Sequence, residues 1–321
     1  MIYNSAMNEL IKRIIPVFLI ILVGYIIKRK NIISDDGVKT LKTLIVTLFL
    51  PASLFFAFLD AEMTSKYLIL IVGVFLFCLL LYLLGLIFKK TAILDSIYGA
   101  EFFTGFEFGM VGIALFSGIF GVKALPVIAL IGMGHEFFIW FVYLPLLQSH
   151  SDEYKTSFKD ILKSFAKSPI IISIIAAIIL NKAGLAAAVR ENYISGGFIT
   201  AVQWFSSVTI AVVLLVLGAS LKFDHIKIGR SLKFLLLRFI IVGAAALAAF
   251  FAVDHIIPGL PELFPYAWLT FFLLPPPYII PIYVPDEHKE ENVFLSNTIM
   301  LYTLFSLAVF VVILFIKPPV L

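Results

Sequence analysis

The sequence has little of what a water-soluble domain or a disulfide-linked secreted domain requires. Only 14% of its 321 residues are charged, and Cys78 is the single cysteine. One cysteine excludes an intrachain disulfide and says nothing about the compartment. The longest polar stretch extends only from Gln148 to Lys167, whereas 62% of the residues are hydrophobic. A soluble domain could not cover that much apolar surface, so we predict an integral membrane protein.

About 20 apolar residues are needed to span a hydrocarbon core of roughly 30 Å. We count ten hydrophobic segments, at 8–28, 37–58, 67–88, 96–119, 123–147, 167–182, 195–220, 231–254, 262–285 and 292–316. The first is followed by the basic run Lys28-Arg29-Lys30 and no cleavage-site pattern, so we interpret it as a retained helix rather than a signal peptide. The expected fold class is an all-α polytopic membrane protein with ten transmembrane helices.

The distribution of Lys and Arg predicts the orientation. With ten spans, alternate connections share a side, and sixteen basic residues then lie on one side against seven on the other. The first group includes the runs near residues 28–42, 155–167 and 222–233. An excess of Lys and Arg marks the cytoplasmic side. We therefore expect a multi-pass protein of the plasma membrane with both termini extracytoplasmic.

Glu107 is the most informative single residue. It lies near the middle of the fourth segment, where an uncompensated carboxylate costs about 3 kcal/mol or more and is a functional site by default. Gly105, Gly109 and Gly112 surround it, which makes a plain lipid-facing helix unfavourable. Close helix approach is an alternative role for glycines at this spacing.

The chain also repeats itself. Leu-Pro-Ala-Ser-Leu at 50–54 returns as Leu-Gly-Ala-Ser-Leu at 217–221, an offset of 167 residues. When the two halves are aligned with this offset, Glu107 matches Leu274, which precedes Pro275-Pro276-Pro277. Five helices per half is an odd number, so the halves would be inverted, with a first repeat at 1–147, a cytoplasmic linker at 148–166 and a second repeat at 167–321. Matching breaks in inverted repeats indicate a transport site near the midplane.

Three consecutive prolines remove three backbone donors, so no continuous helix is expected through Leu274–Tyr278. Freed carbonyl groups must be satisfied by protein or water, and such backbone is expected to line a cavity. A simple proline kink is the alternative. We predict that the fourth and ninth helices are broken at 105–112 and 274–281 and cross near the midplane.

The run PVFLIILVGYIIKRKNIISDDGVKTLKTLIVTLFLPASLFFAF, together with KSPIIISIIAAIIL and VTIAVVLLVLGASLKF, resembles the auxin efflux carrier family. That family belongs with the bile acid and sodium symporters in one superfamily. The resemblance covers essentially the whole chain. It implies ten helices in two inverted repeats, with crossing broken fourth and ninth helices, and transport of small organic acids such as auxin or dicarboxylates.

The chain also departs from the family's pattern. Glu107 stands where the family's fourth helix has Asn, and Ala114 stands where it has the crossover proline. Pro276 and Pro281 match the Pro-x-x-x-x-Pro of the ninth helix. A second negative charge beside an anionic substrate is unfavourable unless Glu107 is protonated part of the time. We expect proton coupling at Glu107, with sodium binding as the alternative.

Further polar residues share this depth. His135 and Glu136 are adjacent, so we expect only one of them to face the site; a proton relay and a hydrogen-bonded structural histidine stay open for His135. Asn297 and Tyr302, with Thr298 and Ser306, recur at helical spacing. Gln203, Ser206, Ser207 and Thr209 do so in the seventh segment, although bonds to their own helix are the more common role. The candidate substrate-binding or coupling residues are Glu107, Gly105, Gly109, Gly112, His135, Glu136, Pro275, Pro276, Pro277, Tyr278, Asn297 and Tyr302.

Arg238 is the one basic residue inside a predicted span, and we expect it about a third of the way across, away from Glu107. His135-Glu136 lacks the second histidine of a His-Glu-x-x-His zinc site, and we expect no enzyme, cofactor or metal. The expected partners are a small-molecule substrate, a proton or sodium ion and the bilayer, with a homodimer open and no nucleic acid. Alternatives to an organic acid transporter are a cation or neutral-solute carrier and a membrane ligand sensor.

Overall fold

The computed structural model describes residues 2–61, 64, 66–89, 96–150, 157–221 and 228–319. The described chain is helical. Its elements are α1 (Ile2–Arg29), α2 (Asp35–Leu44), η1 (Ile45–Phe49), α3 (Leu50–Leu59), α4 (Lys66–Phe88), α5 (Gly99–Phe103), η2 (Phe108–Gly112), α6 (Ile113–Phe120), η3 (Val122–Ala124), α7 (Leu125–Phe138), η4 (Ile139–Tyr143), α8 (Leu144–Gln148), α9 (Phe158–Ala166), α10 (Pro169–Lys182), α11 (Ala186–Glu191), α12 (Tyr193–Ser220), α13 (Ile228–Ile256), α14 (Phe264–Leu273), η6 (Ile280–Tyr283), η7 (Asp286–His288) and α15 (Lys289–Ile316).

Eight of the ten predicted spans have a counterpart in the described chain that is long and apolar enough to cross a bilayer. They are Met7–Arg29, Asp35–Leu59, Lys66–Phe88, Gly99–Phe120, Val122–Gln148, Tyr193–Ser220, Gly229–Ile256 and Lys289–Ile316. Their bounds lie within a few residues of the predicted ones. Hydrophobic length therefore located these helices well.

The sixth and ninth predicted spans differ from the expectation. The sixth corresponds to α10, 14 residues long, which passes the length test only together with α9, across a 55° bend. The ninth begins as α14 and ends after 10 residues at Leu273. Part of the predicted polar linker is thus the helix α9, which Ser157 caps by accepting from Asp160 N–H. Residues 151–156 of that linker lie outside the described residues.

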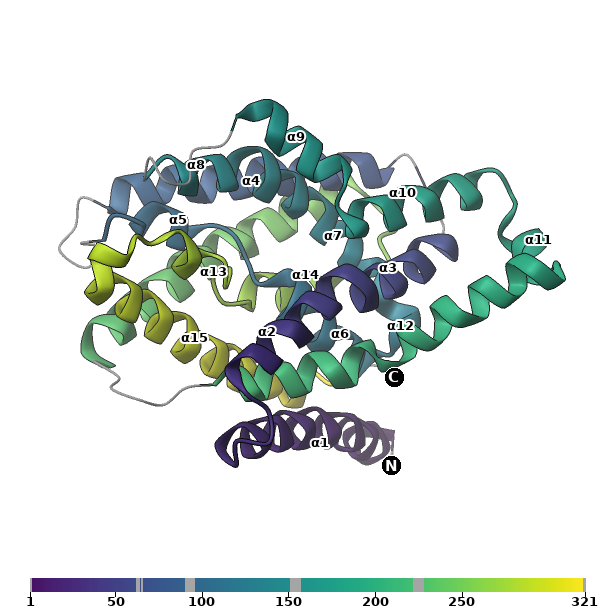
Figure 1. Ribbon diagram of the computed structural model, residues 1–321, viewed down its shortest axis with the longest axis horizontal. Coiled ribbons are helices and arrows are strands. Elements are labelled where there is room, and N and C mark those ends of the chain that lie inside the picture. The colour runs from purple at the N-terminus through teal and green to yellow at the C-terminus, as the bar shows by residue number, and fades with distance from the viewer. Residues whose placement is uncertain are drawn as a thin grey trace.

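Contacts between loops and helix ends that are distant in the sequence occur at two opposite ends of the bundle, near α11 at the right and near α5 and α8 at the left of Figure 1. At the end we name the Arg190 end, Arg190 donates to Asp60 at 2.7 Å and the Asn181 amide donates to the Leu59 and Ala61 carbonyls. At the end we name the Tyr98 end, the Tyr98 hydroxyl donates to the Tyr283 carbonyl at 2.8 Å. Loops that the sequence analysis assigned to opposite sides of the membrane lie at opposite ends.

The packing of α1 against α12 depends on two glycines, and Figure 1 shows the two helices side by side. A Cβ added to Gly24 would lie 2.0 Å from the Leu215 carbonyl oxygen, and one added to Gly218 would lie 1.9 Å from the Ile21 carbonyl oxygen. The two backbones touch without side chains between them, as small residues allow in membrane helices. Gly218 belongs to the repeated Leu-Gly-Ala-Ser-Leu sequence, so this motif has a packing role.

Two of the elements are interrupted inside the bundle. Between α5 and η2 the backbone leaves the helix at residues 104–107, and after α14 it is unwound from Leu274 to Ile279 before the short η6. Most of the surrounding residues are buried, including Phe106 and Leu274. The predicted breaks at Glu107 and at the prolines are therefore interruptions in the described structure.

Candidate functional site

The two unwound segments meet, and Glu107 joins them. Its backbone N–H donates to the Pro275 carbonyl at 2.9 Å. Its carboxylate accepts from Tyr278 N–H at 2.8 Å through Oε2 and from Met110 N–H at 3.3 Å through Oε1. The partners of the carboxylate are thus backbone donors, and the negative charge caps the start of η2, where helix N–H groups favour it.

Glycine and proline both shape this contact. Gly105 has φ 72°, and a Cβ there would lie 2.9 Å from Pro277 Cγ. A Cβ at Gly112 would lie 2.7 Å from Leu274 Cδ1, whereas Gly109 has ordinary space, with Leu50 Cδ1 at 3.6 Å. Gly105 and Gly112 thus permit the close approach of the two segments, and Gly109 does not depend on being glycine.

His135, on the neighbouring helix α7, forms a hydrogen bond to the backbone of the first break. Its Nε2 accepts from Phe106 N–H at 2.9 Å, and its ring packs against the rings of Phe106 and Phe271. An accepting Nε2 means that a neutral ring carries its proton on Nδ1. The Nδ1 atom lies 4.0 Å from Glu136 Oε1. This is the hydrogen-bonded histidine that the sequence analysis weighed against a proton relay.

Glu136 faces another side of the same break. Its side chain is 21% exposed and lines a cavity of 20 Å³ together with Leu50, Phe108 and Gly109. A space of that size suits about one water molecule. The adjacent residues thus both face the fourth-segment break, His135 through its ring nitrogen Nε2 and Glu136 through this small cavity, whereas only one of them was expected to do so.

Hydroxyl groups of α15 contact the second break. The Tyr278 hydroxyl lies 2.9 Å from Thr303 Oγ1 on α15, and the Ser306 hydroxyl donates to the Leu273 carbonyl. Tyr302 is fully buried beside Arg238, and its hydroxyl has no hydrogen-bond partner among the described residues. Asn297 is not brought to the site. It lines a different cavity with Arg230 and Lys289 at the Tyr98 end.

Arg238 contacts the two breaks, and the sequence analysis misplaced it. It lies fully buried on α13 and reaches both breaks. Its Nε donates to the Phe102 carbonyl at 2.9 Å, one terminal nitrogen donates to Gly105 O at 3.0 Å, and the other to Leu274 O at 3.1 Å. The expectation that it lies away from the centre is wrong, because the long side chain spans the distance to the broken backbone.

A family model described as a membrane transport protein matches residues 9–261. The chain belongs to the auxin efflux carrier family. An uncharacterized transporter of Methanocaldococcus jannaschii is 28% identical to it over 232 residues, which cover 67% of this chain and 70% of the relative. The family resemblance predicted from the sequence is confirmed, and the chain is a multi-pass membrane transport protein.

This auxin efflux carrier family member breaks its fourth segment without the crossover proline. Ala114, which stands in that place, lies buried within the helix α6. The interruption lies before it, at residues 104–107, where the positive φ of Gly105 turns the chain. The site of the break is therefore set by Gly105 and by the partners of the freed backbone groups.

Two further cavities of this carrier have charged and hydroxyl residues in their walls. One, of 730 Å³, opens at the Arg190 end and is lined by Phe56, Ala57, Asp60, Val122, Lys123, Pro126, Arg190, Gln203, Ser206 and Ser207. The other, of 220 Å³, is lined by Lys42, Leu217, Ser220, Leu221, Tyr278, Pro281, Ser296, Ile299, Met300 and Thr303. The second reaches the tyrosine that donates to Glu107. A layer of Leu50, Leu54, Phe108 and Ile113 surrounds the small Glu136 cavity.

The predicted polar residues of the seventh segment divide into two roles. Ser206 and Thr209 are buried and meet Ser53 of α3, whose hydroxyl donates to Thr209 Oγ1 at 2.8 Å. Gln203 and Ser207 line the 730 Å³ cavity, and Ser206 contributes to its wall as well. The seventh segment therefore contributes both a packing bond between helices and a polar cavity wall.

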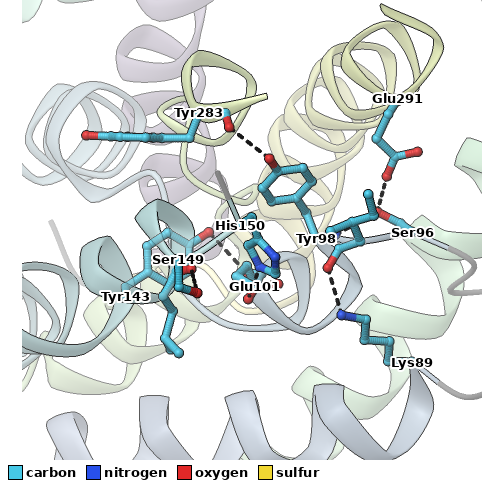
Figure 2. A network of polar contacts seen from close by, with 11 residues as sticks. Lys89, Ser96, Tyr98, Glu101, Tyr143, Ser149, His150, Tyr283 and Glu291 are labelled. Atoms are coloured by element: carbon cyan, nitrogen blue, oxygen red, sulfur yellow. Dashed lines mark hydrogen bonds and ion pairs between the residues drawn. The ribbon is translucent and has the colours of Figure 1, made fainter. Parts of the chain in front are cut away.

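Figure 2 shows a polar network at the Tyr98 end of this carrier. The buried Glu101 carboxylate binds His150 Nε2 at 2.9 Å through Oε1, and its Oε2 has no partner among the described residues. Tyr143 donates to the Glu101 carbonyl at 3.1 Å, and Ser96 bonds to Glu291 on α15. The contacts of Glu101 connect α5, which precedes the first break, to η4 and to the turn after α8, and Ser96 connects the segment before α5 to α15.

Proposed function

We propose that this protein is a secondary active transporter of a small organic acid, coupled to protons, that works by alternating access around the two crossing breaks. Its family supports transport. The observation that carries the rest is the position of Glu107, whose one carboxylate accepts backbone N–H groups from both broken segments. An ionisable group in that place links proton binding to the packing of the crossing.

The coupling follows from donor and acceptor counting. An ionised carboxylate only accepts hydrogen bonds, whereas a protonated one has an O–H donor on one oxygen. Glu107 uses one oxygen for Tyr278 N–H and the other for Met110 N–H. A proton on Glu107 removes the negative charge and so weakens the bonds that its oxygens accept from these N–H groups, which loosens the tie between the breaks and the cap of η2. The neutral form also tolerates a substrate anion.

The charges in the cavities favour an anionic substrate. Lys123 and Arg190 lie in the 730 Å³ cavity with Asp60 as its acidic residue, and Lys42 lies in the 220 Å³ cavity. A cation would meet these charges before it reached Glu107. Auxin-like and other carboxylic acids carry the charge that both cavities attract.

We also propose ten membrane passages in two inverted repeats, residues 1–147 and 167–321. The bent pair α9–α10 and the segment from α14 to η6 supply the two passages beyond the eight long spans. The grouping of loop contacts at two ends supports this count. The Lys-rich Tyr98 end is cytoplasmic in this proposal, because an excess of Lys and Arg marks that side. Both termini are then outside the plasma membrane.

A cation carrier is a second candidate, favoured by the acidic Glu107 beside unwound backbone. Flux assays separate it from the first. Purified protein in liposomes is tested with labelled monocarboxylic and dicarboxylic acids, including an indole carboxylate, and with amines, under an imposed pH gradient. We expect accumulation of an organic acid that disappears when an ionophore dissipates the gradient. Accumulation of amines alone favours the second candidate, and binding without flux for every solute shows a ligand sensor.

A further inference from the structure

Arg238 occupies the place where two half-helices end. Phe102 lies in the last turn of α5, and Leu274 follows the last residue of α14. The C-terminal end of a helix carries a partial negative charge on its free carbonyl groups. The guanidinium of Arg238 bonds to the Phe102, Leu274 and Gly105 carbonyls, so one cation serves both helix ends.

The cation is balanced without a carboxylate partner. Among the described residues, Arg238 has no ion pair with Asp or Glu within 4.0 Å, although it is 0% exposed. A buried charge is costly unless polar groups compensate it. Here three carbonyl groups do so, assisted by the rings of Phe106 at 5.0 Å and Tyr302 at 4.6 Å from the guanidinium carbon.

Unwound carbonyls and half-helix C-termini are also the groups that coordinate sodium in transporters with broken helices. In this chain those groups are already bonded to a cation that is part of the protein. A sodium ion would need the same oxygens that Arg238 uses.

We propose that Arg238 is a tethered cation that fills the cation position of the crossing, so that the transport cycle needs no sodium ion. The statement about the transport cycle rests on the proposed function, whereas the assignment of Arg238 to the cation position rests on its carbonyl contacts. Arg238 is a positioning residue in this account, since it holds the two breaks together and touches no substrate.

Thermal unfolding of the purified protein tests the proposal without a transport assay. The midpoint is measured in sodium chloride and in the chloride of a large organic cation at equal ionic strength. We expect the same midpoint in both salts for the wild-type protein. We expect Arg238→Ala to unfold at a lower temperature in the organic cation, with sodium restoring about 5 °C at a concentration about 100 times its Kd.

Arg230→Ala is the matched control. Arg230 lies on the same helix with its guanidinium 3.9 Å above the Phe294 ring, yet it bonds to neither break in the described structure. Its loss removes one arginine without freeing the carbonyls, so sodium should restore nothing. Arg238→Lys keeps the positive charge and replaces Arg238→Ala in the experiment if the alanine variant does not fold. Sodium should raise the unfolding midpoint of the lysine variant by less than about 2 °C, a third or less of the shift expected for the alanine variant.

Two results would overturn the proposal. One is a sodium-dependent rise in the wild-type midpoint, or organic acid uptake by the wild-type protein that stops without sodium. The other is an unfolding midpoint of Arg238→Ala that is lower than the wild-type midpoint by the same amount in every salt, which would mean that Arg238 only stabilises the fold. Absence of uptake for every acid would contradict the proposed function instead, and the unfolding experiment would still decide the cation question.

Discussion

The backbone N–H of Tyr278 donates a 2.8 Å hydrogen bond to the carboxylate of Glu107, across 171 residues of sequence. In the reverse direction the Glu107 N–H donates to the Pro275 carbonyl. Two bonds of opposite sense therefore join the broken fourth segment to the proline break. One of these hydrogen bonds depends on the Glu107 side chain, which can gain a proton, and the other joins two backbone groups that do not titrate. A change at Glu107 can thus loosen the crossing without separating it.

The glycines of the first break should respond differently to the same substitution. Gly105→Ala places a side chain at φ 72° and 2.9 Å from Pro277 Cγ. The left-handed conformation alone costs about 1–2 kcal/mol for a residue with a Cβ. We expect a midpoint of thermal unfolding several degrees lower and a loss of uptake.

Gly109→Ala is the control for this experiment, because its nearest neighbour, Leu50 Cδ1, lies at an ordinary 3.6 Å. It should unfold within about a degree of the wild-type protein. Equal effects of the two substitutions would show that the break does not need the conformation and contact described for Gly105.

Cysteine accessibility tests the two cavities and the orientation together. The native Cys78 is fully buried, so the background of labelling is expected to be low. Ser207→Cys in the 730 Å³ cavity should react in intact cells with an impermeant maleimide. Ser296→Cys in the 220 Å³ cavity should react only after the membrane is opened. The reverse pattern would show that the Tyr98 end is outside.

The buried pair Glu101–His150 should contribute to stability. Removing the partly exposed His150 leaves the buried carboxylate with no partner on either oxygen among the described residues, which costs about 1–3 kcal/mol. A double-mutant cycle with Glu101→Gln and His150→Ala measures the coupling by unfolding. We expect about 0.5–3 kcal/mol.

The pair Glu9–Lys12, with a similar distance of 2.8 Å but well-exposed side chains, is the matched control. Exposed pairs are weakly coupled, so its cycle should close without measurable coupling. A Glu101–His150 cycle that also closes would mean that this end of α5 is held by Tyr143 and the packing alone.

The sequence was sufficient for the long helices and for the position of the breaks. Hydrophobic length fixed eight spans, and the unusual backbone chemistry of Gly105 and of three consecutive prolines marked where the helices stop. It was insufficient for α14, because an apolar stretch after a proline break is counted as helix by hydropathy whether or not it continues. The unwound residues 274–279 have apolar residues on both sides, so the hydrophobic segment 262–285 extends across them.

The partners at the site could not be read from the sequence. No basic partner for Glu107 is visible in the sequence, and its partners are backbone N–H groups of Tyr278 and Met110, which sequence spacing does not indicate. Arg238 was placed by its distance along a helix, which ignores the reach of its side chain to two other elements. Asn297 has the spacing of an inward stripe but belongs to a cavity near Lys289. The spacing of polar residues along the sequence predicts which side of a helix they share, but it does not predict which other helix packs against that side.

The central claim is that Glu107 carries the proton that drives transport, and Glu107→Gln tests it most directly. The amide keeps one acceptor oxygen and mimics the protonated acid. In liposomes loaded with substrate, the variant and the wild-type protein are compared for accumulation driven by a pH gradient and for exchange of substrate without a gradient. We predict that Glu107→Gln abolishes accumulation and retains measurable exchange. Accumulation by the variant at the wild-type rate would contradict the account and make Glu107 a structural cap of the broken helix.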